Sequence, residues 1–119
     1  MRRSLIRTAA FDEFYDSVPN RVQEKIDYAL QIMSTIPVVS TKFVKKLENT
    51  EFYELRVSAG DEYRVILYTL DKDSFMESGC VLLLNGFKKK SVKDYKGHVA
   101  AAEKILDSLS CKDDKTIIR

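Results

Sequence analysis

The sequence predicts a single α+β domain in which one strand and two helices precede a three-stranded antiparallel meander, and a helix closes the fold. Apolar residues recur at helical spacing before residue 37 and after residue 98, whereas strand patterns occupy residues 52–87. The chain has 119 residues, 45% of them hydrophobic, which is enough for one core and too few for two ordinary domains. We therefore expect a four-stranded sheet within a domain of residues 1–110, followed by a polar tail at residues 111–119.

The first half of the chain predicts a strand and two helices. Residues 3–8 mix branched and polar side chains in a short run, which is typical of a strand. Residues 11–18 carry apolar side chains on one helical face. Asn20 and Gln23 have the spacing of a capping box, so a longer helix is expected to begin there and to end before Pro37.

The middle of the chain predicts a β-hairpin. The stretch 52–57 alternates with a period of two, and the turn-forming residues that follow lead into a second strand over residues 63–70. If the connection runs from Ser58 to Glu62, Arg56 lies directly opposite Arg64 on the same face.

A third strand and a last helix complete the predicted fold. Residues 80–87 form a nearly continuous apolar run, which favours a central place in the sheet. Residues 99–109 show helical spacing again. We expect the helices to cover one face of the sheet and the other face to keep its charged side chains.

Several protein classes are disfavoured by composition. The longest apolar runs are strand-sized and far below a membrane span, and Arg7 interrupts the only stretch that resembles a signal peptide. Two cysteines, Cys80 and Cys111, are too few for a disulfide framework, and His98 is the sole histidine. We expect a cytoplasmic protein that uses no metal and no cofactor.

Lysines occupy five of the nine positions from 88 to 96, although the whole chain has 20 basic and 18 acidic residues. This local positive charge has two interpretations. It can attract an anionic polymer, because a polyphosphate releases counterions when cations bind it. It can equally be a soluble edge that protects an apolar strand from aggregation.

The opposed arginines point to an anionic ligand. Like charges facing each other destabilise a sheet unless an anion lies between them. Lys88, at the end of the neighbouring strand, is expected to join Arg56 and Arg64 around one depression that fits a phosphodiester. The alternative is that Arg56 and Arg64 form ordinary surface ion pairs with Glu54 and Glu62.

The segments 52–57 (FYELRV), 63–65 (YRV) and 82–90 (LLLNGFKKK) together resemble the RelE/ParE toxin superfamily, and within it the HigB-type, phage-derived branch. The resemblance extends over roughly residues 4–109. It implies a RelE-like fold and a toxin of a type II toxin–antitoxin pair that a small helix-turn-helix antitoxin holds inactive. It further implies a ribosome-dependent mRNA endonuclease, in which the ribose 2′-hydroxyl attacks the adjacent phosphate without a metal.

The resemblance also suggests the site. Arg56 and Arg64 match the sheet-face cations, Lys88 matches a basic residue after the strand-ending glycine, and Tyr95 lies near a functional aromatic. His98 adds a group suited to acid–base chemistry near neutral pH. Glu54 stands where some relatives carry a second lysine. The RNA backbone is expected to contact five further lysines: Lys45, Lys46, Lys89, Lys90 and Lys93.

Two other functions stay open on the same fold, because fold does not determine function. One is a non-catalytic ParE-like toxin that inhibits DNA gyrase, which an exposed apolar helix pair would favour. The other is a degenerate member that only binds an antitoxin. For the enzyme, we expect Arg64→Ala to abolish toxicity and to leave thermal unfolding nearly unchanged.

Overall fold

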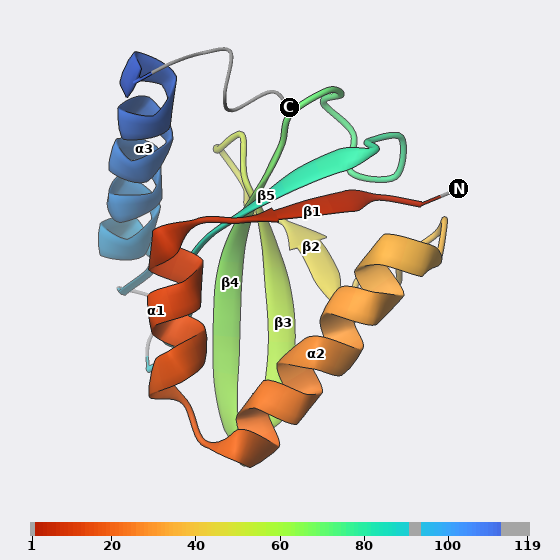
Figure 1. Ribbon diagram of the computed structural model, residues 1–119, viewed down its shortest axis with the longest axis vertical. Coiled ribbons are helices and arrows are strands. Elements are labelled where there is room, and N and C mark those ends of the chain that lie inside the picture. Colours follow the sequence, from red (N-terminus) through yellow and green to blue (C-terminus); the bar gives the residue numbers. More distant parts are fainter. Residues whose placement is uncertain (1, 91–93, 113–119) are drawn as a thin grey trace.

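The computed structural model describes residues 2–90 and 94–112. It contains a five-stranded sheet in the order β1-β5-β4-β3-β2 (Figure 1), in which β1 runs parallel to β5 and the other neighbours are antiparallel. The elements are β1 (Ser4–Arg7), α1 (Ala9–Ser17), α2 (Asn20–Thr35), β2 (Val44–Lys46), β3 (Tyr53–Ala59), β4 (Asp61–Thr69), β5 (Cys80–Lys88) and α3 (Asp94–Lys112). The α+β class and the meander are confirmed.

The predicted count of four strands is wrong, because β2 adds a fifth at the sheet edge. This strand has three residues and pairs with the start of β3. A run so short cannot show a period of two, so nothing in the local sequence distinguishes it from a loop. Residues 113–119 of the predicted tail lie outside the described residues.

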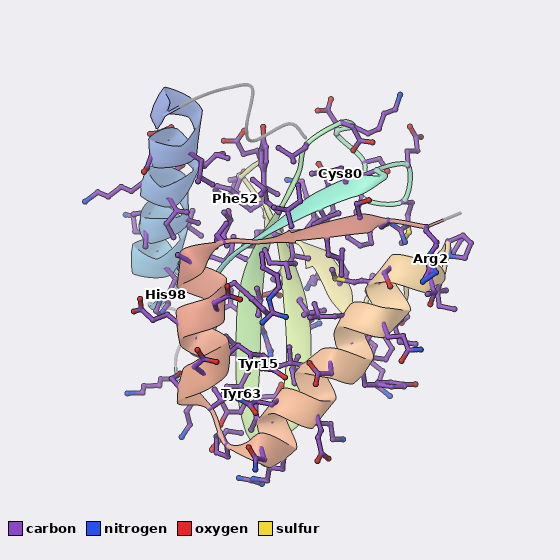
Figure 2. The ribbon with its side chains drawn as sticks, viewed as in Figure 1. Arg2, Tyr15, Phe52, Tyr63, Cys80 and His98 are labelled. Atoms are coloured by element: carbon purple, nitrogen blue, oxygen red, sulfur yellow. The ribbon has the colours of Figure 1, made fainter. Side chains whose placement is uncertain are left out.

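Helices cover both faces of the sheet rather than the single face expected. Helices α1 and α2 lie on one face and α3 lies on the other (Figure 1). Tyr15 and Tyr63 belong to the core under α1 and α2, whereas Phe52 packs with the α3 core (Figure 2). The continuous apolar run of β5 follows from this arrangement, because its alternate side chains enter two different cores.

A β-bulge in β5 changes which side chains face α3. Leu67 pairs with Leu83, but Val65 pairs with Gly86, so β5 gains one residue relative to β4. Gly86 then faces α1, where a Cβ atom would lie 2.3 Å from Phe14 Cδ2, so only glycine fits. Phe87 is turned into the α3 core instead.

The helix starts differ from the predicted capping box. Thr8 caps α1, since its Oγ1 accepts the Phe11 N–H at 3.2 Å and donates to Leu83 O at 2.7 Å. Helix α2 follows Pro19 with no side-chain cap, and Gln23 donates its Nε2–H to Tyr15 O at 2.8 Å. The capping-box prediction is therefore wrong, and the Gln23 side chain joins α2 to α1 instead.

Arg3 is buried, at 3% exposure, and ties three segments together. The central carbon of its guanidinium group, Cζ, lies 4.4 Å from the centroid of the Phe75 ring. It donates hydrogen bonds of 2.6–3.3 Å to five backbone carbonyls, those of Met33, Ile36, Pro37, Phe75 and Met76. The end of α2 and the loop after β4 are thereby fixed to the start of β1.

Candidate active site

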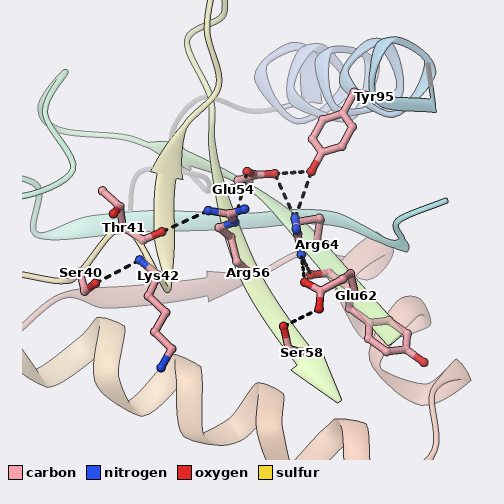
Figure 3. Close-up of polar contacts among 10 residues, drawn as sticks. Ser40, Thr41, Lys42, Glu54, Arg56, Ser58, Glu62, Arg64 and Tyr95 are labelled. Carbon is pink, nitrogen blue, oxygen red and sulfur yellow. Dashed lines mark hydrogen bonds and ion pairs between the residues drawn. The ribbon is translucent and has the colours of Figure 1, made fainter. Parts of the chain in front are cut away.

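Five polar side chains meet on the α3 face of the sheet (Figure 3), and we name them the Glu54 cluster. Strand β3 supplies two of them, β4 supplies two, and the first turn of α3 supplies the last. Arg56 lies directly opposite Arg64, as predicted from the hairpin register. The members of the cluster are Glu54, Arg56, Glu62, Arg64 and Tyr95.

Glu54 is the centre of the cluster and is only 5% exposed. Its Oε1 accepts the Tyr95 hydroxyl at 2.6 Å and lies 3.5 Å from Arg64 Nε. Its Oε2 lies 3.7 Å from Arg56 Nε. The carboxylate therefore relieves the repulsion between the two arginines, which the sequence led us to assign to a bound anion.

Arg64 is fully enclosed, at 2% exposure. Its Nε donates to the Tyr95 hydroxyl at 3.0 Å, and its Nη1 donates to Glu62 Oε1 at 3.2 Å and to Tyr63 O at 2.9 Å. The premise that Arg64 is one of several solvated like charges is therefore wrong. We expect its removal to leave buried partners unpaired and to cost stability.

Tyr95 links the final helix to the sheet. Burial and the hydrogen bond to Glu54 raise the pKa of Tyr95 to about 12, so the phenol stays protonated at neutral pH. The Phe87 ring meets it edge-on, with 5.4 Å between ring centroids. Arg64 thus donates to Tyr95, and Tyr95 donates to Glu54, which is one continuous chain of hydrogen bonds.

The two remaining members lie at the rim. A hydrogen bond of 2.7 Å from Ser58 Oγ holds the pKa of Glu62 below its ordinary value, and the charges of Arg64 and Lys89 add to this effect. The Arg56 side chain is 34% exposed, and its Nη1 donates to Thr41 O at 3.5 Å. Arg56 is therefore the arginine of the cluster that an incoming anion reaches first.

The predicted depression of Arg56, Arg64 and Lys88 is not formed. Lys88 pairs with Tyr63, whose ring lies in the core under α1 and α2, so Lys88 points away from the cluster. Its Nζ lies 3.1 Å from Asp61 Oδ2 on that other side. The next residue, Lys89, donates its backbone N–H to Glu62 O at 2.7 Å and so follows the cluster side of the sheet.

His98 lies beside the cluster rather than in it. Its ring stacks on Phe87 at 3.7 Å between centroids and 6° between planes. It stands one helical turn after Tyr95 on α3 and is partly exposed. Phe87 therefore positions both side chains that α3 brings to this end of the sheet.

The predicted RNA-binding lysines are divided between the two faces. Lys45 is exposed and pairs with Glu54 in the register, so it borders the cluster. Lys46 pairs with Tyr53 on the other face, where its Nζ donates to Thr50 O. Lys90 is exposed after the end of β5, and Lys93 lies outside the described residues.

The sequence interpretation missed the two carboxylates as members of the site. The signal was present as a repeated Glu-x-Arg, in Glu54-Leu55-Arg56 and again in Glu62-Tyr63-Arg64. Side chains two apart on a strand share a face, so each glutamate accompanies its arginine. The alternative of ion pairing with these glutamates is confirmed, although Arg64 and Glu54 pair in the interior rather than at the surface.

Two classes of feature are not found in the described ranges. No helix within residues 2–90 and 94–112 is long and apolar enough to cross a membrane. Over the same residues, no three His, Cys, Asp or Glu side chains are grouped as metal ligands would be.

The same fold occurs in solved toxin structures. A free double arginine-to-alanine mutant of the Escherichia coli toxin RelE is similar to 87% of this chain and 97% of its own, with a TM-score of 0.61 and 16% identity. A chain of the intact E. coli RelBE toxin–antitoxin complex gives 0.55 at 15% identity, over 75% of this chain and 99% of that one. The RelB–RelE antitoxin–toxin complex of Methanococcus jannaschii gives 0.53 at 17% identity, over 76% and 96%. The predicted RelE-like fold is confirmed.

The family is shown by the sequence itself. No curated protein matches the chain in sequence. The sequence pattern of one family does match, however, and it covers residues 13–107, from within α1 to within α3. The predicted HigB-type, phage-derived assignment is thereby confirmed. The chain belongs to the family of phage-derived Gp49-like proteins (DUF891).

Proposed function

We propose that this chain is the toxin of a type II toxin–antitoxin system and an endoribonuclease that cuts mRNA on the ribosome. One observation carries the proposal. A carboxylate, two guanidinium groups and a phenol, contributed by β3, β4 and α3, converge on one face of a RelE-like sheet. Ribose-assisted cleavage needs a base, cations for the phosphorane charge and a proton donor.

Glu54 is the base in this proposal. Its Oε1 is held by Tyr95, so Oε2 is the oxygen that takes the proton from the ribose 2′-hydroxyl. The 2′-oxygen then forms a bond to phosphorus while the bond from phosphorus to the 5′-oxygen breaks. The products are a 2′,3′-cyclic phosphate and a 5′-hydroxyl, and no metal takes part. Tyr95 acts as a positioning residue that keeps the carboxylate in one orientation.

The cations stabilise the transition state. Arg56 turns from its 3.7 Å contact with Glu54 toward the phosphate. Arg64 stays buried and holds Glu54 and Tyr95 in position. His98, one turn along α3 from Tyr95, gives the proton to the leaving 5′-oxygen. Lys45, Lys89, Lys90 and Lys93 then serve the flanking RNA, whereas Lys46 and Lys88 have no part in this mechanism.

The gyrase alternative lacks the feature that would favour it. Of the large apolar side chains of α1 and α2, only Tyr28 is exposed, so this helix pair presents no broad apolar surface. We propose that the partner is a small helix-turn-helix antitoxin and that the toxin acts in the cytoplasm as a single domain of residues 1–110. The two complexes named above are toxin–antitoxin complexes, which supports a partner of that kind.

Expression without the antitoxin tests the proposal. From a tightly controlled promoter, the wild-type chain should stop translation, and primer extension should find translated messages cut within codons. Glu13→Gln, on the exposed face of α1, should behave as wild type. Arrested growth with intact messages and poorly supercoiled DNA would establish the gyrase function instead.

A further inference from the structure

A cavity lies beside the Glu54 cluster, between α2 and β3, and we name it the α2 cleft. It has a volume of about 310 Å³. Strand β2 begins only at Val44, so the edge of β3 is bordered here by the segment before it. The lining of the α2 cleft includes Lys25, Tyr28, Lys42, Phe43 and Arg56.

The α2 cleft is lined by cations without acids. Lys25, Lys42 and Arg56 line it, and no carboxylate does so among the described residues. None of the ion pairs within the described ranges involves Lys25 or Lys42. A cavity of the same volume after β4 is different, because Asp71 and Asp73 accompany its single lysine. The α2 cleft therefore favours an anionic ligand.

An exposed aromatic side chain lies beside these cations. Tyr28 is 57% exposed, which makes it an unusual residue on a helix whose other large apolar side chains are covered. The Phe43 ring lies 6.3 Å from it and supports one side. Aromatic rings next to a positive groove are the arrangement that binds single-stranded nucleic acid, because every base has a face that stacks. The volume lies at the lower end of ligand pockets, roughly 300–1,000 Å³, and so suits one nucleotide rather than a duplex.

Arg56 belongs to both the α2 cleft and the Glu54 cluster. Its Nε faces Glu54, and its Nη1 donates to Thr41 O, next to Lys42 (Figure 3). An RNA strand that leaves the cluster past Arg56 therefore meets Lys42 next. The two sites are continuous because β2 is short: it pairs with Tyr53–Leu55 of β3 and ends before Arg56.

We propose that the α2 cleft binds one nucleotide of the RNA strand that flanks the scissile phosphate. Lys25 and Lys42 hold its phosphate, Arg56 lies between this phosphate and the scissile one, and Tyr28 stacks on its base. This inference rests on the proposed function and names a second contact to the same substrate. An acidic protein segment would pair with the cations, but it would not account for the exposed Tyr28 ring or for the position of Arg56 between the α2 cleft and the Glu54 cluster.

Binding of an uncleavable RNA to the full-length chain tests the proposal directly. A short 2′-O-methyl oligoribonucleotide lacks the attacking hydroxyl, so its dissociation constant can be measured at several salt concentrations without any reaction. The double variant Lys25→Gln/Lys42→Gln should bind at least about 10-fold more weakly at low salt. Its slope of log affinity against log salt should be smaller by roughly 0.7, because the two lysines neutralise one phosphate and each neutralised phosphate of a single strand contributes about 0.7.

Matched controls separate the α2 cleft from general charge. The double variant Lys72→Gln/Lys104→Gln removes the same charge from two exposed positions elsewhere and should bind as wild type does. Tyr28→Ala should weaken binding about 5-fold or more, since stacking on one base is worth roughly 1–3 kcal/mol. Tyr28→Phe keeps the ring and should bind as wild type does. Circular dichroism on each variant confirms that it is folded.

The outcomes separate this inference from the proposed function. If the oligoribonucleotide binds both double variants equally, or does not bind the wild type, the α2 cleft is not a nucleotide site. The same holds if a glutamate-rich peptide, and not the RNA, loses affinity in Lys25→Gln/Lys42→Gln. Cleft-dependent RNA binding without cut messages would overturn the proposed reaction alone, and cut messages with cleft-independent binding would overturn the α2 cleft alone.

Discussion

Arg3 and Arg64 are equally buried, at 3% and 2% exposure, yet they differ in what surrounds them. Five backbone carbonyls surround the guanidinium of Arg3. That of Arg64 is bound mainly by side chains that can titrate, those of Glu54, Glu62 and Tyr95. Carbonyls of a fixed backbone cannot leave or change charge. Carboxylates can be protonated or can give way to a phosphate, so the surroundings of Arg64 suit chemistry and those of Arg3 suit folding.

The largest effect on stability is expected at Arg3. Arg3→Met should lower the free energy of unfolding by about 3–5 kcal/mol, because two of the five hydrogen bonds, those to Phe75 O and Met33 O, are buried, and each buried carbonyl left without a donor costs about 1–3 kcal/mol. Urea denaturation measures this loss. Arg2→Met, at the exposed neighbouring position, is the matched control and should change little. A loss below about 1 kcal/mol, which is no more than one typical hydrogen bond contributes, would show that water bonds to the carbonyls in place of the guanidinium.

A somewhat smaller loss of stability is expected at Arg64, and a second substitution at Glu54 should restore part of it. Arg64→Met should cost about 3 kcal/mol by leaving the Glu54 carboxylate without its buried partner. Adding Glu54→Gln removes that charge and should restore part of the stability, as a double-mutant cycle in urea would show. Additive losses in the cycle would mean that Glu54 and Arg64 do not depend on each other.

Tyr95 gives the cluster a signature at alkaline pH. Its pKa is raised from 10.0 to about 12 in the folded chain. The native state therefore holds the phenol proton more tightly than the unfolded state, and the free energy of unfolding should fall as the pH rises from about 10 to about 12. Tyr95→Phe should reduce this fall. Identical profiles for the two proteins would indicate a solvated Tyr95.

The smallest effect is expected at the rim. Ser58→Ala removes the main cause of the lowered pKa of Glu62, so that pKa should rise toward its ordinary value. A carboxyl group whose pKa is lowered on folding stabilises the folded state at pH values above its unfolded pKa. This stabilisation is lost as the pH falls through the folded-state pKa. The variant should therefore lose less than about 1 kcal/mol at neutral pH, since Glu62 is half exposed. Carbon NMR of the carboxyl measures the shift, with Ser17→Ala as the control; an unmoved Glu62 would contradict the assignment.

The hairpin and its arginine pair were predictable because their determinants are local. A period of two fixed the faces, and Gly60, at a φ of 83°, allowed the tight turn that sets Arg56 opposite Arg64. Tyr95 is 41 residues from Glu54 in the chain, and only the family resemblance pointed to it. The contact itself depends on how α3 docks, which no short stretch of sequence determines.

The misplacement of Lys88 has one physical cause. Without the bulge, the register from Leu67 and Leu83 would continue and place Lys88 opposite Glu62, beside Arg64. The extra residue, at Asn85 and Gly86, moves each later side chain of β5 to the opposite face of the sheet. Lys88 therefore points away from Arg64, and Lys89 lies on the Arg64 side. The role of buried Arg3 could not be predicted either, because its partners are backbone carbonyls, which every residue carries and which leave no signal in the sequence.

Cleavage of a message in the decoding site of purified ribosomes tests the central claim that the Glu54 cluster performs the reaction. The wild-type chain should produce fragments that end in a 2′,3′-cyclic phosphate, and Glu54→Gln should cut roughly 10²–10⁴-fold more slowly, as expected for loss of a general base. Glu13→Gln should cut at the wild-type rate. Unchanged cleavage by a folded Glu54→Gln variant, or no cleavage by the wild-type chain, would contradict the account.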